Sequence, residues 1–172
     1  MRLSEEVKEL LRQGRETELA ERAATDARLV RPLLARLYDP DDAIRGGAAR
    51  VLGHAAAAHP KLGREVARRL IWALNDESAT NGVYGIPALG QIGRLSPDLV
   101  APHVPALARM AWDHGLRLAI LDALAEVAGS SPELVAPELD AIGPHVDASR
   151  PGEDAAWRNL RSAALGDEIH ES

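Results

Sequence analysis

The chain has 172 residues, of which 46% are hydrophobic and only 3% aromatic, and its formal net charge is −6. The length fits a single domain, and a core of Ala, Leu, Val and Ile suits closely packed helices better than strands. The absence of cysteine excludes disulfides, thiolate metal sites and a cysteine nucleophile, and the acidic balance disfavours nucleic acid as the main partner.

The first 25 residues predict two helices, Ser4–Arg12 and Glu16–Thr25, which cover one end of the fold. Residues 1–14 are amphipathic and lack the apolar segment of a signal peptide. No stretch of the sequence approaches the roughly 18 consecutive apolar residues that span a bilayer. We therefore expect a cytoplasmic protein with no membrane partner.

From residue 26 onward the sequence predicts a series of helical hairpins. The pairs Leu52-Gly53, Leu89-Gly90 and Leu124-Ala125 each end seven residues before a proline, at intervals of 37 and 35 residues. Segments 96–108 and 131–143 are identical at seven of thirteen positions. A period of this length is typical of stacked helical hairpins. The helices are expected at 26–38, 41–57, 60–74, 96–112, 114–129, 131–146 and 153–165, with Gly166 as a left-handed cap.

The segment 41–53, DDAIRGGAARVLG, resembles the second helix of a HEAT repeat, and more narrowly the short HEAT-like repeats of phycobilin lyase subunits. The matching features are the acidic start, Ile44-Arg45, Ala48 and Leu52-Gly53, and part of the pattern recurs at Arg117 and Arg158.

The resemblance implies an all-α protein, a right-handed α-solenoid of about four to five HEAT-like hairpins in a single domain over residues 1–172. Within it, residues 1–25 are capping helices, 26–166 are repeats and 167–172 form a polar tail. In the family the arginine joins a ladder of polar contacts within and between repeats. The resemblance thus implies a structural role for Arg45, Arg117 and Arg158, with ligand contact as the alternative.

The second repeat departs from this pattern. By the interval of 37 residues, Gly82, Gly85 and Pro87 take the places of Arg45, Ala48 and Arg50. A helix through all three is disfavoured, since an interior proline costs about 3 kcal/mol and a glycine about 1 kcal/mol. We expect the helix to begin near Ile86, with Pro87 in its first turn, and residues 75–85 to form a loop.

Because locally broken rules tend to mark function or strain, this loop is the candidate binding site. A shortened helix opens a notch on the concave face between Arg45 and Arg117. The candidate residues for partner or ligand binding are Trp72, Asn75, Asp76, Glu77, Ser78, Tyr84, Arg45 and Arg117. Core packing for Trp72 and helix-end capping for Asn75 and Asp76 remain the alternatives.

The leading functional hypothesis is a non-catalytic scaffold or assembly factor that binds another protein. The six histidines form no pair at metal-ligand spacing, no catalytic motif is present, and no cofactor is expected. One alternative is a lyase-like accessory subunit, with Trp72 and Tyr84 stacked on a planar ligand. Nucleic-acid binding is a weaker alternative, although arginines gather in the first half of the chain. A homodimer through the terminal helices stays open.

Overall fold

The computed structural model describes residues 1–76 and 81–166, and all regular structure in these ranges is helical. The predicted N-terminal pair is confirmed as α1 (Leu3–Arg12) and α2 (Glu16–Thr25). The longer helices that follow are α4 (Asp42–Ala58), α5 (Pro60–Asn75), α6 (Ile86–Leu95), α9 (Arg117–Ser130) and α12 (Glu153–Leu165). The shorter α3 (Val30–Arg36) follows a 3₁₀ turn at Ala27–Leu29, where the Asp26 side chain accepts the Arg28 N–H at 3.0 Å. Gly166 ends α12 as expected, but with φ of +77° and ψ of 178°, so it does not form the left-handed cap that the sequence predicts.

The predicted helices 96–112 and 131–146 are not continuous, which corrects the sequence-based expectation. The first divides into α7 (Pro97–Val100) and α8 (Val104–Arg109), and the second into α10 (Pro132–Val135) and α11 (Leu139–Ile142). Pro102 and Pro137 lie in the 3₁₀ turns that separate the two halves. A proline lacks the N–H that an interior helical position requires and clashes with the preceding turn. The break falls at equivalent places in the two copies, so it belongs to the internal repeat.

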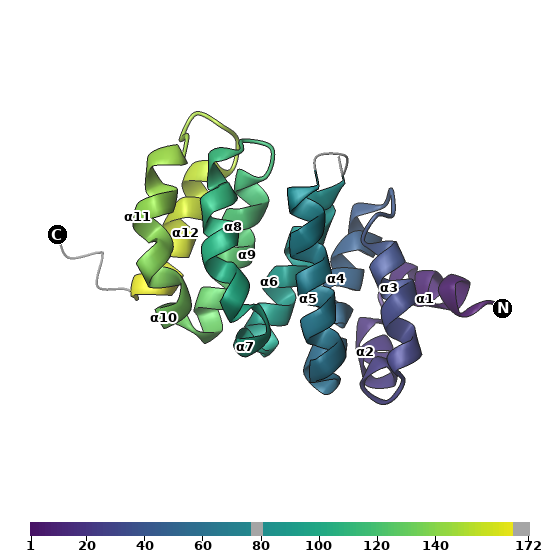
Figure 1. Ribbon diagram of the computed structural model, residues 1–172. Helices are drawn as coiled ribbons and strands as arrows, with labels where there is room; N and C mark the ends of the chain where they lie inside the picture. The colour runs from purple at the N-terminus through teal and green to yellow at the C-terminus, as the bar shows by residue number, and fades with distance from the viewer. Residues whose placement is uncertain (77–80, 167–172) are drawn as a thin grey trace.

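The helices form two rows that run from α1 at one end of the molecule to α12 at the other (Figure 1). In the back row, α4, α6, α9 and α12 follow one another, and each packs against the next. The front row consists of α3, α5, α7 with α8, and α10 with α11. Front-row helices rest on the back row: α3 and α5 on α4, α7 on α6 and α10 on α9.

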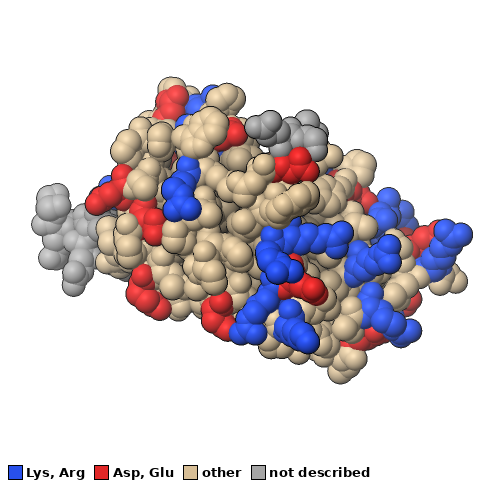
Figure 2. All heavy atoms as spheres, in the orientation of Figure 1, with Lys and Arg blue, Asp and Glu red and all other residues tan. Residues whose placement is uncertain are grey.

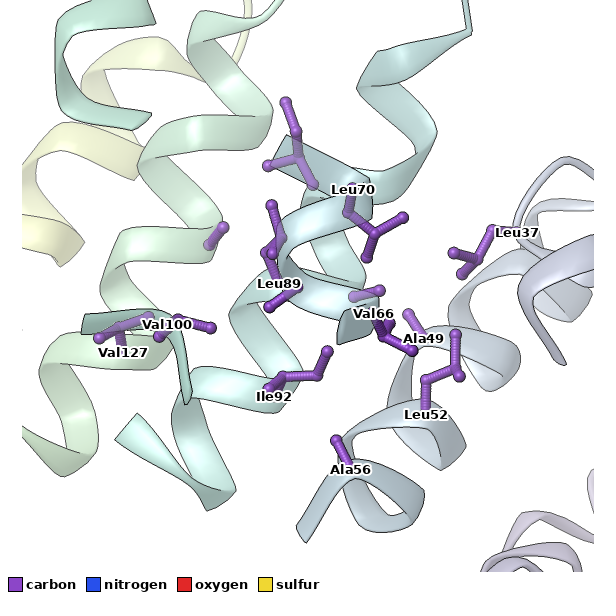
Figure 3. Close-up of a cluster of buried hydrophobic side chains, with 14 of the residues drawn as sticks. Leu37, Ala49, Leu52, Ala56, Val66, Leu70, Leu89, Ile92, Val100 and Val127 are labelled. Atoms are coloured by element: carbon purple, nitrogen blue, oxygen red, sulfur yellow. The ribbon is translucent and has the colours of Figure 1, made fainter. Parts of the chain in front are cut away.

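The core lies between the rows and contains only Ala, Leu, Val and Ile among the buried apolar side chains of the described residues, as composition predicts. Figure 3 shows side chains of α4, α5, α6, α7 and α9 meeting in one cluster. Glycines let the back-row helices approach closely. A Cβ on Gly53 would lie 2.9 Å from the Gln91 carbonyl oxygen, and one on Gly90 would lie 2.9 Å from the Ala123 Cα.

The irregular second repeat has the predicted late helix start, because α6 begins at Ile86 with Pro87 in its first turn. A 3₁₀ turn at Gly82–Gly85 precedes it and packs against α5. A Cβ on Gly82 would lie 3.0 Å from the Ala73 carbonyl oxygen, and one on Gly85 would lie 2.9 Å from the Leu70 Cδ2. A Cβ at either position would therefore press on α5, at the Ala73 backbone or at the flexible end of the Leu70 side chain.

No helix within residues 1–76 and 81–166 combines the length and the apolar character needed to cross a membrane.

Candidate functional site

A groove lies between α3 and α5. Elsewhere in the front row, neighbouring helices pack on one another, α5 with α7 and α8 with α11. Between α3 and α5 a cavity of about 760 Å³ remains instead. Its lining residues are Ala27, Arg28, Val30, Arg31, Leu34, Leu62, Glu65, Val66, Arg68, Arg69 and Trp72. We call this feature the α3/α5 groove.

Two helical stripes build the α3/α5 groove, and its floor is aliphatic. Residues 27, 31, 34 and 38 recur at helical spacing on the α3 side, and residues 62, 65, 69 and 72 do so on the α5 side. Val30 and Leu34 of α3 face Leu62 and Val66 of α5 across the floor. Such a surface can bury apolar groups of a ligand.

At its end near the α5 C-terminus, the α3/α5 groove adjoins a second cavity of about 330 Å³. The two cavities share Arg31, Leu34, Arg69 and Trp72. The second adds Tyr38, which is 45% exposed, beside Trp72, which is 66% exposed. Exposed aromatic side chains at the end of an apolar groove are typical of binding surfaces.

The rim of the α3/α5 groove is basic, in contrast to the acidic chain as a whole. Its lining contains four arginines and one glutamate, whereas the chain carries a net charge of −6. Figure 2 shows Lys and Arg side chains gathered over α3 and α5, with few on the part of this face over α8 and α11.

Arg28 differs from the other rim arginines because Asp26 holds it. Its Nε and Nη2 donate to the two Asp26 carboxylate oxygens at 2.9 and 2.8 Å. These bonds and the Arg28 N–H lower the pKa of Asp26 to about 2. Arg31, Arg68 and Arg69 make no ion pair or hydrogen bond within residues 1–76 and 81–166. Their guanidinium groups are available to an anionic partner.

Of the residues predicted from sequence for the site, Trp72 lies in the α3/α5 groove. Asn75 ends α5, and its side-chain amide donates to the Ile71 carbonyl oxygen at 3.3 Å. Glu77 and Ser78 lie outside the described residues.

The spacing of Asp76 points to a turn. Asp39, Asp76 and Asp113 recur every 37 residues. The carboxylates of Asp39 and Asp113 each accept the backbone N–H two residues on, from Asp41 at 3.0 Å and from Gly115 at 2.8 Å. Asp side chains commonly close turns in this way. The regular spacing favours the same turn-forming role for Asp76.

Arg45 and Tyr84 meet, but their contacts are internal. The Arg45 guanidinium lies over the Tyr84 ring, 4.9 Å from its centroid, and Tyr84 meets Tyr38 edge to face at 6.4 Å. Arg45 Nη1 also donates to the carbonyl oxygens of Asp39 at 2.7 Å and Pro40 at 3.2 Å. This cluster connects the second repeat to the first.

Arg117 lies in a different place, in the contact between α9 and α12. It is 6% exposed and forms an ion pair with Glu153. Its guanidinium donates to the carbonyl oxygens of Ala111 and Trp112, six and five residues earlier. Arg45 also donates to the carbonyl oxygens six and five residues before it, so the two arginines make equivalent contacts in their repeats. Arg158 does not, since it forms an exposed pair with Asp154.

A third cavity, of about 410 Å³, lies on the back row and is smaller than the α3/α5 groove. It is on the face where the sequence predicts a concave binding surface. Two of its charged groups, Arg50 and Glu16, already pair with each other. Arg50 donates twice to the Glu16 carboxylate, at 2.7 and 2.8 Å, and this lowers the pKa of Glu16. The α3/α5 groove is therefore the stronger candidate for a binding site.

Sequence reasoning missed Arg31, Leu34 and Leu62 as site residues. The two helical stripes can be found in the sequence, but the sequence does not show that they face each other across a groove. No group of three or more potential metal ligands occurs within residues 1–76 and 81–166.

Comparison with protein-family models, curated proteins and solved structures gives no match for this chain.

Proposed function

We propose that this chain is a non-catalytic scaffold or adaptor that holds a segment of another protein in the α3/α5 groove. The observation that carries the proposal is the groove itself, with an aliphatic floor, an exposed Trp72 and three arginines that make no ion pair or hydrogen bond among the described residues. This combination provides apolar burial together with charged anchors, which is how protein interfaces gain affinity and specificity.

In this proposal the fold is an α-solenoid of about four to five HEAT-like hairpins in a cytoplasmic protein. Support comes from the back row, where each helix packs on the next, and from the intervals of 37 and 35 residues. The shared contacts of Arg45 and Arg117 with the preceding turn support it further. Solenoids of this kind leave long surfaces free for partners.

The test is affinity capture from a lysate of the source cells with three forms of the protein. The groove variant carries Arg69→Ala and Trp72→Ala. The matched control carries Arg109→Ala and Trp112→Ala, which changes the same residue types at another front-row helix, where Trp112 is also 66% exposed. We expect a protein that is captured by the wild type and the control and lost from the groove variant. Equal capture by all three forms would place the interface elsewhere.

The size of the α3/α5 groove favours a second candidate function, the holding of a small ligand. A cavity of about 760 Å³ lies within the range of small-molecule sites, and Trp72 with Arg31 or Arg69 can hold a planar carboxylate ligand. Native mass spectrometry of the protein purified from its source cells distinguishes the two. A bound small molecule that is absent from the Arg69→Ala, Trp72→Ala variant would favour the ligand-holding role.

A further inference from the structure

We propose that the segment held in the α3/α5 groove is an acidic amphipathic helix of about three turns. This proposal rests on the proposed function and specifies the chemistry of the partner. Three features of the groove carry it: the charge of its rim, the character of its floor, and its shape.

The rim requires carboxylates. Arg31 stands on the α3 side, and Arg68 and Arg69 stand on the α5 side, each without an ion pair among the described residues. A segment that covers the groove removes water from these guanidinium groups, and the loss is offset only if the segment supplies negative charge. Asp and Glu fit best, because a carboxylate can accept two parallel hydrogen bonds from one guanidinium. A basic segment is excluded by repulsion from both sides.

The floor requires an apolar face on the same segment. Val30, Leu34, Leu62 and Val66 offer aliphatic surface and no hydrogen-bonding side chain. Phosphate or sugar groups gain nothing from such a floor, which favours a peptide over nucleic acid. The partner must therefore carry acidic and apolar residues on adjacent faces, which is the definition of an amphipathic segment.

The shape of the groove favours a helix. Its α5 wall runs from Leu62 to Trp72, which corresponds to about 15 Å at the helical rise of about 1.5 Å per residue. Elsewhere in the front row, the neighbour of a helix is another helix, as α7 is to α5 and α11 is to α8. A third helix laid between α3 and α5 would extend this packing. It would place apolar side chains at positions i, i+3 or i+4, and i+7 on the floor.

The test is a selection from a displayed library of random helical peptides about 15 residues long, long enough for the three turns and their ends. Peptides that bind the wild-type protein are kept. Peptides that also bind a variant with Arg31→Glu and Arg69→Glu are discarded, because their binding does not depend on the rim arginines. We expect enriched peptides with apolar residues at the spacing given above and Asp or Glu on both flanks. Enriched peptides without an acidic bias would overturn the proposal, and so would the absence of any peptide that prefers the wild type.

Fluorescence anisotropy of the tightest-binding selected peptide then measures how much Arg31 and Arg69 each contribute to its affinity. We expect Arg31→Glu and Arg69→Glu each to weaken binding about tenfold or more, with a smaller loss for Arg31→Gln and Arg69→Gln. A peptide with one flanking Glu changed to Lys should recover affinity for one of the charge-reversal variants. Arg109→Glu, an exposed arginine on α8 outside the groove, should stay within about twofold of wild type.

Two further outcomes separate this proposal from the proposed function. If a protein is captured through the groove but its bound segment is neutral, basic or not helical, only the identity of the segment is wrong. If a DNA duplex at physiological salt competes with the selected peptide and binds more tightly, with steep loss at higher salt, the rim is a phosphate-binding surface and the peptide proposal fails.

Discussion

Arg117 of α9 and Glu153 at the start of α12 form a buried ion pair, with Nη1 3.0 Å from Oε1. The remaining donors and acceptors of the pair are also used within the protein. Arg117 Nε donates to the Ala111 carbonyl oxygen at 2.7 Å and Nη2 to that of Trp112 at 3.1 Å, while Glu153 accepts the Asp147 N–H at 2.8 Å. The pair therefore joins the last two hairpins.

Removal of one partner of this pair should destabilise the fold strongly. Glu153→Ala leaves the buried Arg117 guanidinium without its ion-pair partner, which typically costs about 3–5 kcal/mol of unfolding free energy. Urea unfolding followed by circular dichroism measures the loss. The control, Asp154→Ala, removes the exposed pair with Arg158 and should change the unfolding free energy by less than about 1 kcal/mol. Similar small effects for both variants would mean that the buried pair does not hold the two hairpins together.

Two glycines of the back row should respond in opposite directions to alanine. Gly90→Ala should cost about 1–3 kcal/mol, because the new methyl group would lie 2.9 Å from the Ala123 Cα and would push α6 from α9. Gly129→Ala should stabilise by about 0.5–1 kcal/mol, because it lies in α9 with no atom near its Cβ position. Thermal unfolding of both variants under one buffer condition checks the signs. If Gly90→Ala leaves the stability unchanged, α6 and α9 can move apart to accommodate the methyl group without loss of unfolding free energy.

The sequence predicted the elements whose signals are local. Gly82, Gly85 and Pro87 indicated that the inner helix of the second repeat starts late, and α6 does begin at Ile86. In the structure the 3₁₀ turn that holds both glycines packs closely on α5, and Tyr84 of the same turn contacts Arg45.

The prediction of continuous helices at 96–112 and 131–146 was wrong. It rested on the apolar stripe of each segment, and each segment also contains an interior proline. Pro102 and Pro137 interrupt the hydrogen-bond ladder without interrupting the burial of residues on either side, such as Leu99 and Leu107. Hydrophobic spacing survives a 3₁₀ turn, so it cannot by itself show that a helix is unbroken.

The α3/α5 groove could not be derived from the sequence, since it depends on the spacing of two front-row helices. Trp72 is predicted because it lies just before the loop of the second repeat, whereas only the folded arrangement places Arg31 of α3 in the same groove as Trp72. The interval of 37 residues that joins Asp76 to Asp39 and Asp113 is present in the sequence, and it favours a turn-forming role for Asp76.

Acid should weaken the fold partly through Asp39, which is 5% exposed. Burial raises the pKa of this carboxyl, but the Asp41 N–H and the cations of Lys8 and Arg36 outweigh burial and hold the pKa below its usual value. A lowered folded-state pKa contributes stability above pH ~4, and that contribution is lost as the pH falls through the folded-state value. Asp39→Asn should therefore destabilise at pH 7 and flatten the acid limb of the curve of unfolding free energy against pH.

Asp122 provides a control of opposite sign for this experiment. Asp122 is exposed on α9, where partial desolvation raises the pKa of its carboxyl and the nearby Glu126 raises it further. Its charged form is disfavoured in the fold, so Asp122→Asn should stabilise at pH 7, and the gain should vanish in acid, where Asp122 itself is protonated. If both variants shift the unfolding free energy in the same direction at pH 7, the assigned pKa directions are wrong for one of them.

Trp72 should matter for binding and little for folding. Since its side chain is 66% exposed, Trp72→Ala should change the unfolding free energy by less than about 0.5 kcal/mol. Leu70→Ala, two residues away on the same helix but buried, should cost about 2–5 kcal/mol. Urea unfolding separates the two variants, and anisotropy with a peptide selected on the α3/α5 groove measures the binding. We expect Trp72→Ala to weaken that binding about tenfold or more, as truncation of an aromatic anchor does at interfaces. A Trp72→Ala variant that binds the peptide like wild type would mean that the occupant does not reach this end of the groove.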